Sequence, residues 1–376
     1  MKPSREFDII LQGASGFTGQ LAARELALRA PEGLRWAVAG RSAPRIAAIA
    51  NQHDVPYVIA DGLQWSAVSE LAQRTRVVLS CAGPFRRYGT PLVDACVQAG
   101  THYADLSGEL PWIQDIVKRH HTQCAAEGTT LIPASGFDSV PADLGVWALQ
   151  QEMQSSQPVH GFFSIRGGIN GGTLHSGLAL GEDGHLQATA SRPSAKAKVF
   201  AVPSLQRWAA PFLMAPVNES VVHRSAILLA EQQHGYGNDF SYDEHMLLPS
   251  RWQAHSMSAV LSLSTTMLNS SWGRKLLHRF GPQPGQGPSE ESQRNGFAHL
   301  TLIAGSLESP SCTRQWHWSG DPSNLITVRC LVQTGLALAA GDAQSGGVLT
   351  PATALGHRLL QRLQEIEAVR VQPCTS

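Results

Sequence analysis

The sequence has few charged residues and no excess charge of either sign. Asp, Glu, Lys and Arg make up 15% of its 376 residues and hydrophobic residues make up 43%, whereas charged residues form roughly a quarter of a typical globular chain. This composition excludes intrinsic disorder, and the length predicts two domains or one large core with an insertion. The 29 basic residues balance the 29 acidic ones, so no overall field favours nucleic acid as a partner.

Paired cysteines and long apolar runs are also missing. The six cysteines are scattered without a Cys-x-x-Cys pair, which argues against a zinc site and against a compact disulfide framework. Reduced thiols predict a cytoplasmic location. The apolar run near the start, Ile9 to Leu11, is too short for a signal peptide. The sequence contains no run of about 18 apolar residues, so no membrane-spanning helix is expected.

What the sequence does contain is a regular alternation of β-rich runs and helical stretches from Phe7 onward. This rhythm predicts an α/β fold, with a doubly wound parallel sheet of the Rossmann type covering residues 1–145. The six strands that we expect are Phe7–Gln12, Leu34–Ala39, Val55–Ala60, Arg76–Cys81, Thr101–Asp105 and Thr129–Ala134.

The rhythm breaks after about residue 150. Strand-like pieces follow at Phe162–Arg166, Ala226–Ala230 and Ala298–Ala304, with long irregular connections between them. We therefore expect a second, mixed α+β domain of mixed or antiparallel sheet over residues 146–330, serving the substrate or dimerisation. Residues 331–376 would form C-terminal helices that return to the first domain, one of them opened by Thr350 and Pro351.

A glycine-rich loop joins the first expected strand to the first expected helix. Its glycines are Gly13, Gly16 and Gly19, with Ser15, Phe17 and Thr18 between them. In this position backbone N–H groups and the helix dipole can bind a pyrophosphate. Glycines also serve ordinary tight turns, but the strand–loop–helix context favours dinucleotide binding.

The end of the second strand indicates which dinucleotide is bound. An NAD site would carry a carboxylate there for the ribose hydroxyl, but the sequence has Arg41 and Ser42. A guanidinium can grip a 2′-phosphate, so the expected cofactor is NADPH. The alternative is a solvated surface arginine. Asp61, just past the third strand, could reach the adenine or serve as a turn residue.

Several motifs together resemble the saccharopine dehydrogenase-like oxidoreductases, and within them the trans-acting enoyl reductase branch. The resemblance spans nearly the whole chain in order and rests on Gly13–Gly19, Ala39–Ser42, Cys81–Phe85, Tyr88–Gly89, Gly100–Tyr103, Asp105–Glu109, Gly136–Pro141, Asp143–Gly145, Gly171–Thr173, Pro284–Ser289 and Gly346–Pro351. It implies an NADPH-dependent reductase of an unsaturated acyl, lipid or polyketide-type intermediate. Where relatives tend to have Gly-Tyr after Asp-Pro, this chain reads Asp321-Pro-Ser-Asn324, so the substrate pocket could differ.

Loops at the carboxyl ends of the later strands carry the candidate chemical groups, because doubly wound sheets bind ligands at that edge. Cys81, Ala82, Gly83 and Pro84 would approach the nicotinamide ribose, with Cys81 more consistent with a small buried residue than with a nucleophile. Tyr88 could donate a proton to a developing enolate or pack under the loop. No tyrosine has a Lys four residues on, which excludes a Tyr-x-x-x-Lys mechanism.

A second group of candidates surrounds the fifth and sixth strands. Two-residue alternation places Tyr103 and Asp105 on one face of the sheet and His102 on the other. Glu109 could be catalytic or a first-turn helix carboxylate, and Asp138 could be catalytic or a helix cap. The adjacent His120 and His121 are expected to be solvated, since no third ligand lies at metal spacing.

Three functions remain open on sequence alone. The first is enoyl reduction in trans, with a small or carrier-bound acyl substrate, a polyketide synthase as a possible partner, and a homodimer as the expected assembly. The second is reduction of a C=N bond in an amino acid–aldehyde adduct. The third is NADPH binding or lipid association without turnover. The apolar stretches Trp208–Val217 and Met257–Leu268 could be buried core, a lipid-facing groove or a dimer surface.

Overall fold

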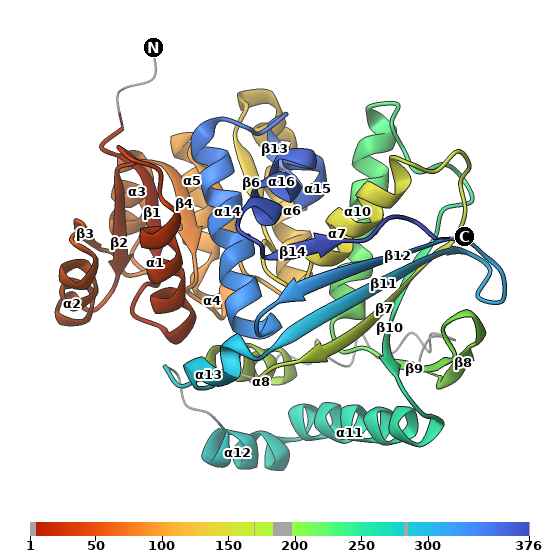
Figure 1. Cartoon of the computed structure of the whole chain (residues 1–376). Coiled ribbons are helices and arrows are strands. Elements are labelled where there is room, and N and C mark those ends of the chain that lie inside the picture. Colours follow the sequence, from red (N-terminus) through yellow and green to blue (C-terminus); the bar gives the residue numbers. More distant parts are fainter. Residues whose placement is uncertain (1–4, 169, 183–197, 282–284, 376) are drawn as a thin grey trace.

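The computed structural model describes residues 5–168, 170–182, 198–281 and 285–375. Its first sheet, sheet A, has seven strands in the order β13-β6-β5-β4-β1-β2-β3, and every neighbouring pair is parallel (Figure 1). The strands are β1 (Phe7–Gln12), β2 (Trp36–Gly40), β3 (Tyr57–Ile59), β4 (Thr75–Ser80), β5 (His102–Asp105), β6 (Thr130–Ile132) and β13 (Gly347–Val348). The predicted doubly wound parallel sheet is confirmed.

Helices cover both faces of sheet A because its buried strands are apolar on both sides. Ile9 and Leu11 of β1 face one hydrophobic cluster, and Ile10 faces another. The helices that connect or cover the strands are α1 (Phe17–Arg29), α2 (Ala43–His53), α3 (Trp65–Arg74), α4 (Phe85–Tyr88), α5 (Thr90–Ala99), α6 (Leu110–Glu127) and α7 (Val140–Gln150).

The second sheet, sheet B, is mixed, as the sequence predicts. Its order is β14-β12-β11-β7-β10-β9-β8, and only β7 and β10 run parallel. The strands are β7 (Val159–Arg166), β8 (Phe200–Val202), β9 (Arg207–Pro211), β10 (Tyr242–Leu248), β11 (Phe297–Gly305), β12 (Pro310–Ser319) and β14 (Val369–Val371). The last of these brings the C-terminal segment back to sheet B.

The strand predicted at Ala226–Ala230 is wrong, because these residues belong to helix α10 (Ala215–Glu231). Val217, Val221 and Leu228 are buried at helical spacing, and this longer period is what settles the element type. The other helices that sheet B carries are α8 (Gly171–Glu182), η2 (Pro203–Leu205), α11 (Arg251–Asn269), α12 (Ser271–Phe280) and α13 (Glu290–Arg294).

The C-terminal part contributes η3 (Pro322–Ile326), α14 (Thr327–Ala340), α15 (Pro351–Ala354) and α16 (His357–Glu365). Helix α14 is buried against α1, β4 and β5. Within the described residues one segment, Pro322–Ala340, is long and apolar enough to cross a membrane, but 78% of that window is buried inside the protein. Its apolar character is thus explained by packing between the two sheets (Figure 1).

The structure pairs two of the six cysteines, contrary to the expectation of reduced thiols throughout. Cys312 on β12 and Cys374, just after β14, form a disulfide with a Cα–Cα distance of 5.7 Å. The other four are free: Cys81, Cys96, Cys124 and Cys330. The bond links neighbouring strands of sheet B at the C-terminal end of the chain.

Candidate active site

The glycine loop has the geometry of a phosphate-binding turn. Gly13 adopts a φ of +82°, and a Cβ on Gly19 would lie 2.1 Å from the Gly13 carbonyl oxygen. Neither position therefore accepts a side chain. Helix α1 begins directly after Gly16 without a side-chain cap, which leaves its first-turn N–H groups available to an anion.

The groups predicted to read the adenosine half lie beside this loop. Arg41 is exposed and follows β2 directly, and Gly40, which precedes it, packs close to the Ser15 hydroxyl. Asp61 accepts a hydrogen bond from the Leu63 N–H at 3.0 Å, which is the turn role that the sequence left open. The cradle and the exposed guanidinium fit a dinucleotide with a 2′-phosphate.

A segment of the second half of the chain covers the glycine loop. A Cβ on Gly287 would lie within 2.6 Å of three ring atoms of Phe17, so Gly287 packs flat on this ring. Arg24 of α1 pairs with Glu290 at 2.8 Å, and the Gly171 N–H donates to the Gln286 carbonyl at 2.9 Å. Phe17 therefore has a structural contact, which sequence spacing alone could not show.

The Cys81–Pro84 loop lies against the glycine loop. A Cβ on Gly13 would be 2.9 Å from the Ala82 nitrogen, and the Cys81 N–H donates to the Gln12 carbonyl at 2.9 Å. The Gly83–Pro84 bond is cis. Burial raises the pKa of the Cys81 thiol to about 12, so this side chain is not a thiolate nucleophile at neutral pH.

Glu109 holds this loop in place. Its carboxylate accepts the N–H groups of Phe85 at 2.8 Å and of Arg86 at 2.9 Å, and the Ser176 hydroxyl of α8 also bonds to it. Burial raises the Glu109 pKa even though these donors oppose the effect. With its oxygens occupied by the loop, Glu109 acts as a positioning residue.

Tyr103 and Asp105 lie on one face of sheet A, as predicted, and bond to each other. The Tyr103 hydroxyl donates to Asp105 at 2.8 Å, and the N–H groups of Ser107 and Ala134 donate to the other carboxylate oxygen at 2.9 and 3.0 Å. Burial raises the Asp105 pKa to about 7 and the Tyr103 pKa well above its usual value. Because Tyr103 is 1% exposed, this pair joins the β5 and β6 loops from within the core.

Tyr88 ends helix α4, whose first residues bond to Glu109. Gly62, which follows β3, packs against the backbone of Tyr88, and the Arg87 guanidinium lies over the Tyr88 ring, 5.4 Å from its centroid. The strand order places β3 at the far edge of sheet A from β5 and β6. Helix α4 thus extends from the Glu109 carboxylate to the loop after β3, where Tyr88 lies.

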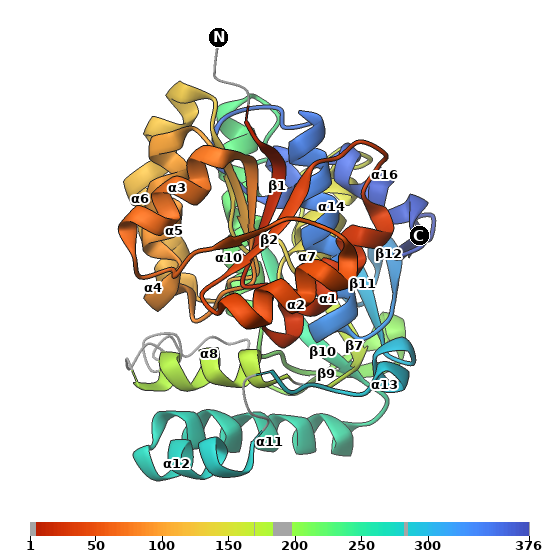
Figure 2. The same cartoon turned by 90° about the vertical axis from the view of Figure 1, so that its left-hand side faces the viewer.

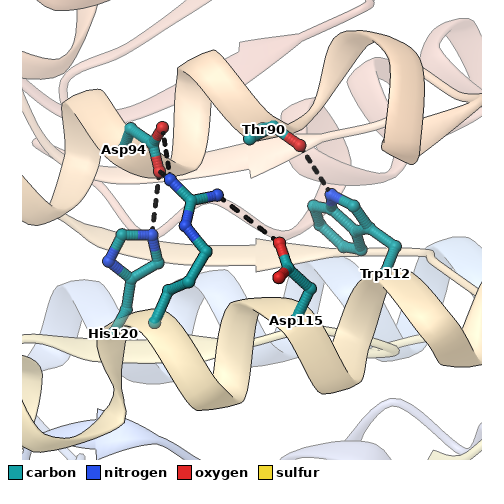
Figure 3. Close-up of polar contacts among 6 residues, drawn as sticks. Thr90, Asp94, Trp112, Asp115 and His120 are labelled. Carbon is teal, nitrogen blue, oxygen red and sulfur yellow. Dashed lines mark hydrogen bonds and ion pairs between the residues drawn. The ribbon is translucent and has the colours of Figure 1, made fainter.

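Polar contacts join helices α5 and α6, which lie next to the loop that Glu109 holds (Figure 3). The Trp112 indole donates to the Thr90 hydroxyl at 3.0 Å, while His120 and Arg119 both bond to Asp94 at 2.8 Å. The prediction that His120 is solvated is wrong, because it is 8% exposed. His121 also points inward and bonds to the Val348 backbone. Asp94 of α5 and Val348 of β13 therefore cover a helix face that looks solvent-exposed in the sequence.

Asp138 has a different environment from the other carboxylates. It lies in the loop between β6 and α7, half-buried, and none of the described residues donates a hydrogen bond to its carboxyl group. Gly108 lies beside both this carboxyl group and the Met214 side chain. Burial alone raises the Asp138 pKa to about 6.

An apolar wall from sheet B begins next to Asp138. The Phe137 ring lies 5.7 Å from that of Phe163 on β7, and Phe163 lies 5.0 Å from Phe212. Met214, at the start of α10, continues the wall toward Gly108. A half-buried acid and an apolar core cluster thus meet where the loop between β6 and α7 contacts sheet B.

The departure at Asp321-Pro-Ser-Asn324 also has a structural role. Asp321 accepts the Gly168 N–H at 2.8 Å, Asn324 donates to the Gly168 carbonyl at 3.1 Å, and Asn170 donates to Asn324 at 2.7 Å. These bonds fix the chain between β7 and α8 onto η3. Sequence spacing alone does not reveal these bonds, because the partners are more than 150 positions apart.

A cavity of about 370 Å³ lies on the other face of sheet B. Ser164 and Thr301 line it, whereas Phe163 and Leu300, the next residue in each strand, point to the core. The sheet therefore separates this cavity from Asp138, and we do not assign the reaction to it.

Together, the parallel sheet, the glycine cradle and the covering second sheet define a dinucleotide-dependent oxidoreductase. Residues 9–132 match the family model of the saccharopine dehydrogenase NADP binding domain, which identifies NADP(H) as the cofactor. The structure is similar to that of a saccharopine dehydrogenase from Saccharomyces cerevisiae, with a TM-score of 0.59, 13% identity and coverage of 98% of this chain and 100% of that one.

The chain belongs to the trans-acting enoyl reductase family. It is 34% identical to a trans-acting enoyl reductase of Mycobacterium bovis, over 96% of this chain and 97% of that protein. It is 33% identical to a trans-acting enoyl reductase of Mycobacterium leprae, over 96% of both chains. The protein is thus an NADP-dependent oxidoreductase, and the resemblance drawn from the motifs is confirmed.

Replacing the exposed guanidinium beside the glycine loop should change cofactor selectivity. We expect Arg41→Ala to weaken NADPH binding by about 30-fold, because a charge-assisted bond to the 2′-phosphate is lost, and to leave NADH binding unchanged. Titrations of both cofactors by tryptophan fluorescence would measure this. Arg358→Ala, at an exposed arginine of the C-terminal part, is the matched control, and equal losses for NADPH and NADH in Arg41→Ala would contradict the assignment.

Proposed function

We propose that the protein reduces the C=C bond of an α,β-unsaturated acyl, lipid or polyketide-type intermediate with NADPH, and that Asp138 supplies the proton. The observation that carries this proposal is the Asp138 carboxyl group, which is unpaired among the described residues, has a pKa raised to about 6 and faces the junction of the two sheets. A carboxylic acid whose pKa is raised toward neutrality suits general acid catalysis.

The glycine loop, Arg41 and the Cys81–Pro84 loop would hold NADPH, which when bound would provide the hydride for the β carbon. The two electrons of the C=C bond move toward the α carbon, which takes the Asp138 proton. The products are the saturated acyl group and NADP⁺, and solvent restores the proton on Asp138. Glu109 keeps the cofactor loop in position but exchanges no proton with the substrate.

The apolar wall supports the choice of substrate class. The rings of Phe137, Phe163 and Phe212 pack on one another in the core that begins beside Asp138, and such apolar surroundings suit an acyl chain better than a polycarboxylate. Two of the arginines that could bind a polycarboxylate substrate are engaged elsewhere in the described part of the chain. Arg224 donates to the Val348 carbonyl at 2.5 Å, and Arg251 stacks on Trp208 at 5.7 Å.

The direct test is NADPH oxidation with three kinds of substrate. We expect turnover with an α,β-unsaturated acyl thioester on a carrier protein, slower turnover with the same acyl group on coenzyme A, and none with an amino acid and aldehyde together. Turnover only of the amino acid–aldehyde pair would favour C=N reduction. Tight NADPH binding without any turnover would favour the binding-protein alternative.

The names of the relatives motivate the proposal of a partner. An enoyl reductase that acts in trans would receive its substrate from the carrier domain of a separate polyketide synthase, so we propose such a partner together with a cytoplasmic location. A homodimer and the division of the chain at residues 145 and 330 stay predictions. Light scattering of the purified protein and limited proteolysis would test the two.

A further inference from the structure

The outermost edge of the second half of the chain is formed by helices α11 and α12. In two views they form the lower edge of the molecule, below α8 and away from sheet A (Figures 1 and 2). One face of α11 packs on α8, β9 and β10, with Ala254 buried and Met257 and Leu261 half-buried. The helix position is therefore fixed, and its opposite face points outward.

That outward face carries large apolar side chains, which we call the α11–α12 face. Trp252 is 79% exposed and Leu263 62% exposed, eleven residues apart on the same side of α11. Trp272 is 69% exposed and Phe280 74% exposed, eight residues apart on α12. The stretch Met257–Leu268, for which the sequence left core, groove or dimer surface open, is thus not core on this side.

The charged residues within the α11–α12 segment itself have one sign, and the acidic residue that the structure describes at the end of the neighbouring helix α8 is Glu182. The sequence has no Asp or Glu between Glu244 and Glu290 but has four cations there, Arg251, Arg274, Lys275 and Arg279. Lys275 and Arg279 are exposed on α12 between Trp272 and Phe280. Arg274 instead points inward and donates to the Leu268 and Asn269 carbonyls. In a chain with zero net charge, this is a local concentration of positive charge next to exposed aromatic rings.

We propose that the α11–α12 face docks the protein on an anionic lipid surface, as a peripheral contact that leaves the fold unchanged. Aromatic and aliphatic side chains would enter the headgroup boundary, and Lys275 and Arg279 would pair with lipid phosphates. Charge complementarity selects anionic over neutral lipids, and the position at the outermost edge lets both helices reach a plane together.

The docked orientation would place the substrate route close to the lipid. Helix α8 lies between the α11–α12 face and the nucleotide loop, since it packs on α11 and its Ser176 bonds to Glu109. A hydrophobic acyl intermediate would then reach the junction of the sheets from the bilayer side. This step rests on the proposed function, whereas the docking itself does not.

Co-sedimentation of the full chain with vesicles tests the docking. We expect binding to vesicles that contain phosphatidylglycerol and loss of most of that binding in high salt. Binding to vesicles of phosphatidylcholine alone should be weaker by about tenfold or more. The double variant W272S/F280S should bind at least about tenfold more weakly. The affinity of K275E/R279E for the phosphatidylglycerol vesicles should fall at least about 25-fold, since each charge contributes roughly five-fold.

Matched variants elsewhere on the surface are the controls. Trp65→Ser removes an aromatic ring that is 45% exposed on α3, and R358E/R370E reverses two exposed cations of the C-terminal part. Both should bind vesicles like the unmodified chain. No binding to anionic vesicles at low salt, or equal losses in the controls, would overturn the proposal.

A second readout separates lipid from protein occupants. Light scattering without vesicles should give the same mass for W272S/F280S and the unmodified chain. A dimer that this variant dissociates would overturn the proposal and assign the face to a second copy. Retained vesicle binding in both double variants, with loss of binding to an acidic carrier protein, would likewise overturn it in favour of the carrier.

Discussion

Asp138→Asn should reduce the turnover of an enoyl thioester by about 100-fold to 10,000-fold while leaving NADPH affinity unchanged. The amide has nearly the same shape but cannot release a proton to the α carbon. Because the acid form is the active one, turnover of the unmodified protein should fall as the pH rises through about 6, the value to which burial raises the Asp138 pKa. The variant should lose this pH dependence, which NADPH absorbance at a series of pH values would show.

Stability measurements separate this effect from misfolding. A carboxyl group with a raised folded-state pKa contributes stability below its unfolded value near 3.8, and this contribution is lost as the pH rises through about 6. Asp138→Asn has no charge to bury, so its melting temperature at pH 8 should equal or exceed that of the unmodified protein. Asp115→Asn, which removes an exposed ion-pair partner of Arg119 (Figure 3), is the control. Unchanged turnover in Asp138→Asn would remove it from the mechanism.

The nucleotide half of the site was predictable from the sequence because its signals are local. Gly13, Gly16 and Gly19 follow a strand and open a helix within one short segment, and Arg41 sits at a position whose role depends only on the end of the next strand. Six β-rich runs separated by helical stretches likewise predict a parallel sheet. Such features need no long-range contact to be recognised.

The chemical half was not predictable in this way, because its meaning depends on partners far along the chain. Asp105, Glu109 and Asp138 look alike in the sequence. In the structure Asp105 and Glu109 accept hydrogen bonds from backbone N–H groups of nearby loops, whereas no described residue donates one to Asp138. The same limit explains the wrong prediction for His120, whose partner Asp94 lies on the preceding helix. Ala226–Ala230 failed for another reason, since a short apolar run has no period of its own.

Asp143 is the second residue whose replacement should have a large effect, although the sequence showed it only as part of a motif. It is fully buried in α7. Its carboxylate accepts the Ser225 hydroxyl of α10 and, at 2.7 Å, the Ala352 N–H of α15, while Ser225 and Thr350 bond to each other at 2.6 Å. This network joins helices from three distant parts of the chain.

Asp143→Ala should lower the free energy of unfolding by about 3–5 kcal/mol at pH 5, because it leaves several buried donors without an acceptor. The cost should be about 1.4 kcal/mol smaller at pH 8, because part of the contribution of Asp143 is already lost at pH 5. Burial raises the Asp143 pKa to about 6, so the stability that this residue contributes is present below its unfolded value and is lost as the pH rises through about 6. Urea unfolding at the two pH values would measure both effects.

The control for this prediction is Asp342→Ala, which removes the partner of Arg362 at 3.2 Å, an ion pair in which both side chains are partly exposed. Such pairs contribute at most about 1 kcal/mol, so its effect should be small at either pH. If Asp143→Ala were no more destabilising than Asp342→Ala, the buried network would not hold α7, α10 and α15 together. The contact between the sheets around Asp138 would then depend on apolar packing alone, and the position of the proposed acid would be set by Phe137, Phe163 and Phe212.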